Sequence, residues 1–97
     1  MAIEHIVLLE WNESTTEDQI QECIDGLRAL KENIPGIQSI RAGTNFSERA
    51  GNITHAAVIT MEDKAALDGY GPHPAHQELL KTLGPALKNI TVVDFEA

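Results

Sequence analysis

Apolar and β-branched side chains, with a partial alternation of polar ones, mark the first segment of the chain, residues 3–11 (IEHIVLLEW), as a β-strand, in which every second side chain points to the same face. The period lengthens after residue 16. Apolar side chains then recur every three or four positions as far as Asn33, as on one face of a helix. Thr16 is the expected N-cap, because Gln19 follows three positions later as in a capping box, and Pro35 with the glycine after it ends the helix.

Local signals continue this pattern through the rest of the chain. The polar stretch SERAGN at 47–52 predicts the turn of a hairpin, Asp63 is the expected cap of a short helix, and Pro74 begins the next helix. Pro85 ends or kinks that helix, because proline lacks the N–H group that a helix interior needs. The elements expected in this half are strands over 37–46 and 53–61, helices over 64–70 and from Pro74 to about Leu83, and a last strand over 90–95.

The predicted order of elements is βαββαβ with the second helix in two pieces, which is the order of the ferredoxin-like fold, in the α+β class. This fold has a four-stranded antiparallel sheet with both helices on one face. The 97 residues suit one domain, residues 1–97, with no room for a second core. A single domain is therefore expected to carry the function.

Both faces of the predicted sheet are apolar. In the first strand Val7 and Leu9 share one face, while Ile6 and Leu8 share the other. The helices cover only one of these faces, so the other would be a large exposed apolar patch. Packing against a copy of itself in a two-fold dimer covers such a patch. We therefore expect a homodimer in which two sheets meet face to face.

The charge balance excludes several classes of partner. Lys and Arg total 7 against 15 Asp and Glu, a formal charge of -8, and no basic cluster is present to neutralise phosphates or anionic headgroups. Neither nucleic acid nor a membrane surface is an expected partner.

No apolar run approaches the roughly 20 residues of a membrane span, and the N-terminal segment lacks the basic region of a signal peptide. With Cys23 as the only cysteine, a reducing, cytoplasmic location is expected.

The segment YGPHPAHQ, residues 70–77, concentrates side chains with acid–base chemistry. His76 follows Pro74 near the start of a helix, where the positive end of the helix dipole disfavours imidazolium and keeps the ring neutral. A neutral imidazole accepts a proton, and Tyr70, across a Gly-Pro turn, is placed to donate a hydrogen bond to an oxygen. Proton abstraction next to a carbonyl needs both groups, and assistance of this kind is typically worth about 10²–10⁴-fold in rate.

Five segments of the sequence carry a resemblance: IEHIVLLEW, IPGIQSIRAGTNFS, THAAVIT, ALDGYGPHPAHQEL and VVDFEA. Together they span essentially the whole chain and resemble the stress-responsive dimeric α/β-barrel (Dabb) domain family. The resemblance implies the ferredoxin-like fold and a homodimer whose two subunits form an α/β barrel. Some members of this family are plant stress proteins. Others are polyketide cyclases, which close a linear polyketide with a histidine base and a tyrosine partner.

By this resemblance, Tyr70 and His76 match the catalytic tyrosine and histidine of the cyclases, and His5 and His55 match strand histidines that line their substrate pocket. The first helix departs from the cyclases, because CIDGLRAL has no tyrosine where they carry one. We expect a small pocket between the sheet and the broken second helix, with His76 as base and Tyr70 as orienting donor. The expected ligand is a small hydrophobic or carbonyl-containing molecule, and the expected chemistry is polyketide cyclase-like or isomerase-like.

Other functions stay open on the sequence, and so does the question of whether the chain is an enzyme. A non-catalytic, stress-associated homodimeric scaffold or ligand carrier needs only the apolar sheet face and the pocket. Fold analogy adds cofactor-free monooxygenases. Metal binding is a further alternative, since His73 and His76 are three positions apart, but no HExxH motif or cysteine pair supports it and no metal site is assigned. No cofactor is expected, because Walker A and GxGxxG loops are absent.

Each site residue also fits a purely structural role. Tyr70 fits a buried aromatic residue, and His5 and His55 fit core histidines that are bonded to a backbone carbonyl or a partner side chain. His73, directly before Pro74, fits a turn or cap residue. The sheet face that carries each strand histidine depends on the strand register, since a shift of one residue reverses it.

Overall fold

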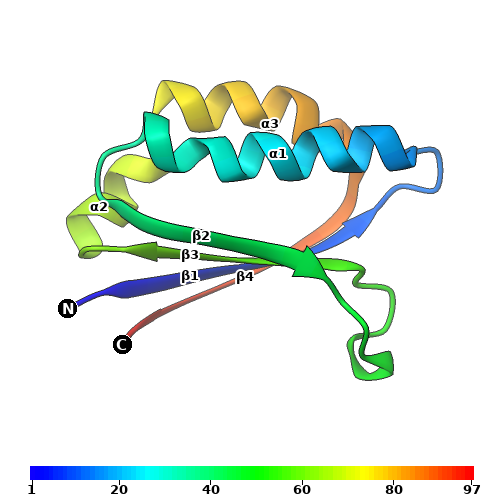
Figure 1. Ribbon diagram of the computed structural model, residues 1–97, viewed down its shortest axis with the longest axis horizontal. Helices are drawn as coiled ribbons and strands as arrows, with labels where there is room; N and C mark the ends of the chain where they lie inside the picture. Colours follow the sequence, from blue (N-terminus) through cyan, green and yellow to red (C-terminus); the bar gives the residue numbers. More distant parts are fainter.

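The computed structural model describes residues 1–97 and has the predicted order of elements (Figure 1). The elements are β1 (Ile3–Trp11), α1 (Glu17–Asn33), β2 (Ile37–Thr44), a 3₁₀ turn η1 (Glu48–Ala50), β3 (His55–Met61), α2 (Lys64–Tyr70), α3 (Pro74–Ala86) and β4 (Leu87–Glu96). The strands form one antiparallel sheet in the order β2-β3-β1-β4. The fold is thus ferredoxin-like and of the α+β class, as the sequence predicted.

The helices begin where short polar side chains cap them. Thr16 and Gln19 form the reciprocal capping box of α1, and the Asp63 side chain accepts from the backbone N–H of Ala66 at the start of α2. At α3 the cap is His73, whose Nδ1 accepts from the backbone N–H of Ala75 at 3.1 Å. The bond to His73 confirms its predicted role as a cap residue.

The end of α3 differs from the prediction, because the helix continues through Pro85 to Ala86 and β4 begins directly at Leu87. The sequence predicted an earlier helix end and a later start of the strand. The loop after β1 stabilises this junction: Asn12 Nδ2 donates to the carbonyls of Pro85 and Leu87 at 2.9 and 3.0 Å. Thr15 Oγ1 donates to the Ala86 carbonyl at 2.8 Å. These capping groups come from a distant segment, which local sequence cues do not reveal.

The hairpin between β2 and β3 also has a longer loop than predicted, since the strands end at Thr44 and resume at His55. The cause is Asn45, whose side-chain Nδ2 donates to the carbonyls of Ser47 and Ile53, both at 2.9 Å. Those two residues are therefore bound within the loop and do not extend the strands.

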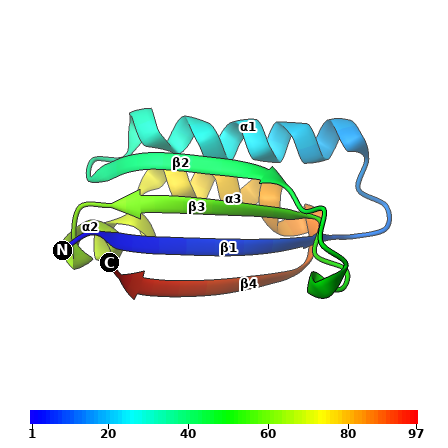
Figure 2. The ribbon, with the colours of Figure 1, turned by 60° about the horizontal axis from the view of Figure 1, so that its bottom comes forward.

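The helices α1 and α3 cover one face of the sheet, and the opposite face carries no helix (Figures 1 and 2). The core lies under the helices and contains 14 buried apolar residues, among them Leu9, Ile59 and Met61 at 1% exposure or less. His5 is the only buried polar residue. None of the helices has the length and the apolar content to cross a membrane.

Candidate functional site

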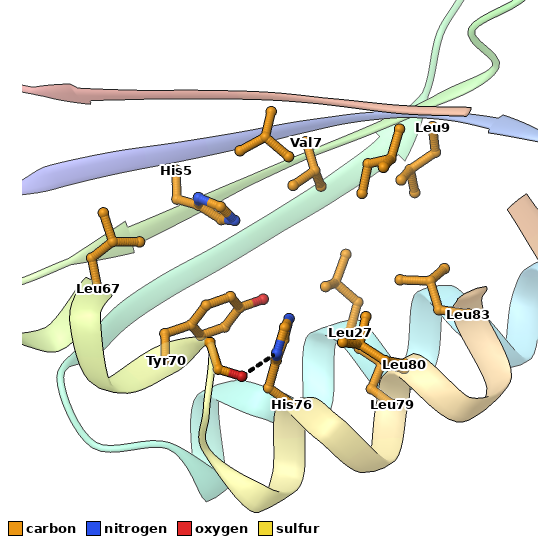
Figure 3. Close-up of a pocket in the computed structure, with 13 residues that line it drawn as sticks. His5, Val7, Leu9, Leu27, Leu67, Tyr70, His76, Leu79, Leu80 and Leu83 are labelled. Carbon is orange, nitrogen blue, oxygen red and sulfur yellow. Dashed lines mark hydrogen bonds between the residues drawn. The ribbon is translucent and has the colours of Figure 1, made fainter.

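A cavity of about 330 Å³ lies between the helix-covered face of β1 and β4 and the helices α1, α2 and α3 (Figure 3). Ten of its 13 lining residues are hydrophobic. The lining residues are His5, Val7, Leu9, Leu27, Leu67, Tyr70, Gly71, His76, Leu79, Leu80, Leu83, Ile90 and Val92. The volume is at the lower end of the range for small-molecule sites, roughly 300–1,000 Å³.

Three polar side chains meet at one end of this cavity. His5 comes from the middle of β1, Tyr70 from the last position of α2, and His76 from the first turn of α3. The ring centroids of Tyr70 and His76 are 4.4 Å apart, and those of His5 and Tyr70 are 5.3 Å apart. Figure 3 shows the Tyr70 hydroxyl pointing into the space between the two imidazoles. The structure therefore brings together three of the four predicted site residues.

The break between α2 and α3 orients His76. Its Nδ1 lies 2.9 Å from the carbonyl oxygen of Gly71, which also accepts from Gln77 Nε2 at 2.7 Å. A carbonyl oxygen only accepts hydrogen bonds, so Nδ1 carries the hydrogen and donates it. In the neutral ring, Nε2 then keeps its lone pair, and Figure 3 shows this nitrogen pointing into the cavity. His76 is thus held in the tautomer that a base acting on a bound molecule requires.

His5 is held in the same way by a carboxylate. Its Nδ1 bonds to Oδ1 of Asp94, which lies directly opposite His5 in the antiparallel pairing of β1 with β4. A carboxylate that accepts from Nδ1 leaves Nε2 free to accept from a ligand in the neutral ring. Sequence reasoning missed this role of Asp94, although an acidic residue within an apolar alternation was a signal. Its partner became evident only from the strand register.

Tyr70 is the hydrogen-bond donor of the site. Burial raises the pKa of its phenol to about 12, since the charged phenolate would lose its hydration. The phenol therefore stays protonated near neutral pH. A protonated hydroxyl at this position donates to an oxygen atom of a bound molecule more strongly as that oxygen gains negative charge.

The remainder of the cavity is apolar and carries no formal charge. Figure 3 shows Leu9 and Leu83 at the end away from the imidazoles, and no Lys, Arg, Asp or Glu is among the lining residues. A bound carboxylate or phosphate would have no cationic partner there, and leaving a charge unpaired in an apolar site is costly. The cavity therefore suits a neutral molecule with a polar group at one end and an apolar body.

His55, which was expected in the same pocket, does not line this cavity. It lies at the start of β3 opposite Leu9, whereas His5 lies opposite Ile59. There its Nδ1 accepts from Trp11 Nε1 at 3.0 Å, and the two rings meet edge to face. His55 thus matches the alternative of a structural histidine bonded to a partner side chain, because the register separates it from His5 along the strands.

The arrangement that a metal site needs is also missing. No group of three or more His, Cys, Asp or Glu side chains is gathered closely enough to hold an ion. Of the two histidines considered for that role, His73 uses its Nδ1 to cap α3, and His76 uses its Nδ1 to bond Gly71. Because Nδ1 of His73 accepts a hydrogen, Nε2 of its neutral ring carries one, so of these two histidines only His76 keeps a free lone pair, on Nε2.

Known proteins resemble this chain in both sequence and fold. The family model described as "Stress Responsive A/B Barrel Domain" matches residues 3–97. The chain is 26% identical over 96 residues to the stress-response A/B barrel domain-containing protein HS1 of Arabidopsis thaliana, covering 97% of this chain and 88% of that protein. It is 27% identical over 78 residues to olivetolic acid cyclase of Cannabis sativa, covering 78% and 77%. A solved dimeric ferredoxin-like protein of unknown function from Jannaschia sp. CCS1 is 33% identical, with a TM-score of 0.87 and full coverage of both chains.

Proposed function

The chain belongs to the stress-responsive A/B barrel domain family, and from this premise we propose that its cavity binds a small neutral carbonyl compound and catalyses proton abstraction next to the carbonyl. The observation that carries this proposal is the convergence of one donor and one acceptor on an apolar cavity. Tyr70 supplies a protonated hydroxyl, and His76 in its neutral form supplies the lone pair of Nε2, with ring centroids 4.4 Å apart. His5, held by Asp94, is the proposed substrate-binding residue beside them.

The proposed reaction begins at the carbon next to the carbonyl. His76 Nε2 accepts the proton from that carbon, so a C–H bond breaks and an N–H bond forms. The electron pair moves onto the carbonyl oxygen, where the Tyr70 hydroxyl donates a hydrogen bond to the developing negative charge. In a cyclase-like reaction the resulting enolate attacks a second carbonyl of the same molecule. In an isomerase-like reaction the His76 imidazolium returns the proton to another carbon.

Similarity to olivetolic acid cyclase supports the proposed type of reaction but does not identify a particular substrate. The relative that is named olivetolic acid cyclase is 27% identical to this chain. The wall of the cavity contributed by α1 is Leu27, and this chain has no tyrosine in that helix. An apolar side chain there adds no further hydrogen-bonding group to Tyr70, His5 and His76, so a ligand with one polar end is favoured over one with polar groups along its length.

A non-catalytic ligand carrier is the second candidate. The observation that favours it is the hydrophobic character of ten of the 13 lining residues, which suits retention of an apolar molecule without reaction. Both candidates include binding at the same cavity, and they differ only in whether His76 removes a proton.

We also propose that two copies of the chain form a homodimer. Ile6, Leu8 and Val58 lie on the sheet face that carries no helix, and none of them is fully buried within one chain. Val93 and Phe95 on the neighbouring edge strand are each 47% exposed. The similar protein from Jannaschia sp. CCS1 is described as dimeric. Two such faces in contact would remove these apolar side chains from water.

Binding is tested with a series of straight-chain methyl ketones labelled with ¹³C at the carbonyl. Each added methylene that enters the cavity contributes about 0.8 kcal/mol, so the Kd falls about fourfold per methylene until the apolar end is full. The hydrogen bond from Tyr70 is expected to move the carbonyl ¹³C resonance of the bound ketone downfield. Tyr70→Phe is expected to abolish most of that shift while the ketone still binds.

His55→Ala serves as the matched control, because it removes a histidine from the same sheet face without touching the cavity. It is expected to leave both the Kd and the carbonyl resonance unchanged. A Kd that is independent of chain length, or a carbonyl resonance that is identical in wild type and Tyr70→Phe, would contradict binding in this cavity.

A further inference from the structure

The loop between β2 and β3 presents one aromatic side chain entirely to solvent. Phe46 is 100% exposed, more than any other large hydrophobic residue of the chain. A single exposed apolar side chain is ordinary on a protein surface, so exposure alone carries no function. Phe46 differs from an ordinary exposed side chain in two ways: its loop is held by hydrogen bonds, and the loop lies beside the bare sheet face.

The loop holds Phe46 in place from both sides. On one side, the backbone N–H of Asn45 donates to the Thr54 carbonyl at 2.7 Å. On the other side, the backbone N–H of Ser47 donates to Asn45 Oδ1 at 2.9 Å, and Ser47 Oγ accepts from the N–H of Arg49 to cap η1. The backbone that carries Phe46 is therefore ordered before any contact forms, which lowers the entropy cost of binding through this loop.

The position of the loop points to its partner. In both ribbon views the loop extends past the end of the sheet and away from the helices, on the side of the bare sheet face (Figures 1 and 2). We call residues 45–54 with Phe46 the arm. The arm and the bare face that carries Ile6, Leu8 and Val58 are thus on the same side of the molecule. A partner molecule that packs on this face therefore also lies next to the arm.

The bare face alone is small for a stable interface. Strands about 4.8 Å apart and residues spaced by about 3.3 Å give the sheet a face of roughly 500 Å². A stable complex typically buries about 800 Å² on each partner. A buried phenylalanine adds about 150–250 Å², and the rest of the arm adds more. The arm therefore supplies area of about the size that the face lacks.

We propose that the arm is a clasp of the homodimer, in which Phe46 of each subunit packs on the second copy of this chain that covers its bare sheet face. This inference rests on the homodimer of the proposed function and adds a segment to the interface. The two-fold symmetry places two such contacts in each dimer.

The test measures the dimer Kd by sedimentation equilibrium for wild type, Phe46→Ser, Phe46→Leu and Arg49→Ser. Phe46→Ser is expected to raise the Kd roughly 100-fold or more, since each dimer loses two buried aromatic side chains that contribute about tenfold or more apiece. Phe46→Leu keeps an apolar contact and is expected to stay within about tenfold of wild type. Arg49→Ser, in the same loop, is expected to leave the Kd unchanged. Circular dichroism shows whether each chain is folded.

Val58→Asp separates the arm from the face, because it places a charge at the centre of the bare sheet. If Val58→Asp dissociates the dimer while Phe46→Ser binds as tightly as wild type, the clasp is refuted and the homodimer stands. If wild type is monomeric at all concentrations, both the clasp and the homodimer are refuted. An assembly larger than a dimer that Phe46→Ser reduces to dimers would place the arm between dimers and also refute the clasp.

Discussion

Tyr70 offers the most informative single perturbation, because it is the only tyrosine of the chain and its ionisation has its own ultraviolet absorbance. Burial raises the pKa of its phenol from an ordinary value of 10.0 to about 12 in the folded protein. In the unfolded chain the phenol returns to its ordinary pKa. The folded state thus binds this proton more tightly than the unfolded state.

The sign of the effect on stability follows from the two pKa values. Because the folded-state pKa is the higher one, the contribution of the protonated phenol is fully present below about pH 10 and is lost as the pH rises toward about 12. Linkage gives a loss of about 1.4 kcal/mol in the free energy of unfolding at about pH 11, and about 2.7 kcal/mol above pH 12. The expected result is a decline of this size in wild type relative to Tyr70→Phe.

The assay combines two measurements on both proteins. Urea unfolding at about pH 8 and about pH 11 gives the change in free energy of unfolding, and the difference between the proteins removes the titration of the lysines, which both share. Tyrosinate absorbance gives the pKa of the phenol directly, with circular dichroism as a check on folding. A midpoint near 10 in protein that is still folded would refute the account of Tyr70 as a desolvated donor.

Two further substitutions test the fold around the site. Gly36→Ala is expected to lower the free energy of unfolding, measured by urea titration, by roughly 2 kcal/mol. The φ of Gly36 is +90°, and an added Cβ would lie 2.6 Å from the Cβ of Ala66 in α2. Gly43→Ala is the control, because no atom lies within 4 Å of its added Cβ, and equal losses in the two variants would contradict this reasoning. His55→Ala is expected to lower the free energy of unfolding by about 1–3 kcal/mol, because Trp11 Nε1 loses its hydrogen-bond acceptor. A stability equal to wild type would show that this bond contributes nothing.

Much of the fold could be predicted because its signals are local. The alternation of β1, the capping box of α1 and the Asp63 cap of α2 each depend on residues close together in sequence. The end of α3 could not be predicted in this way, since Asn12 caps it from more than 70 positions away. Tertiary contacts there override the local signal of Pro85.

The candidate site was likewise predictable only where its residues are close together in sequence. Tyr70 and His76 are six residues apart, and the Gly-Pro turn between them predicted their proximity. The strand histidines depended on register, which the sequence pattern did not specify. His55 pairs with Leu9, four positions from His5, which separates the two histidines by about 13 Å along the sheet. The same register placed Asp94 opposite His5, where no sequence motif indicated it.

The central claim is that the cavity removes a proton next to a bound carbonyl. Exchange of the α-hydrogens of a methyl ketone for deuterium in D₂O tests this claim without knowledge of the natural substrate, and NMR measures its rate. The account predicts exchange above the buffer rate, a loss of about 10²-fold or more in His76→Ala, and no change in His55→Ala. A ketone that binds in the cavity but exchanges at the buffer rate would contradict the catalytic claim and favour the ligand carrier.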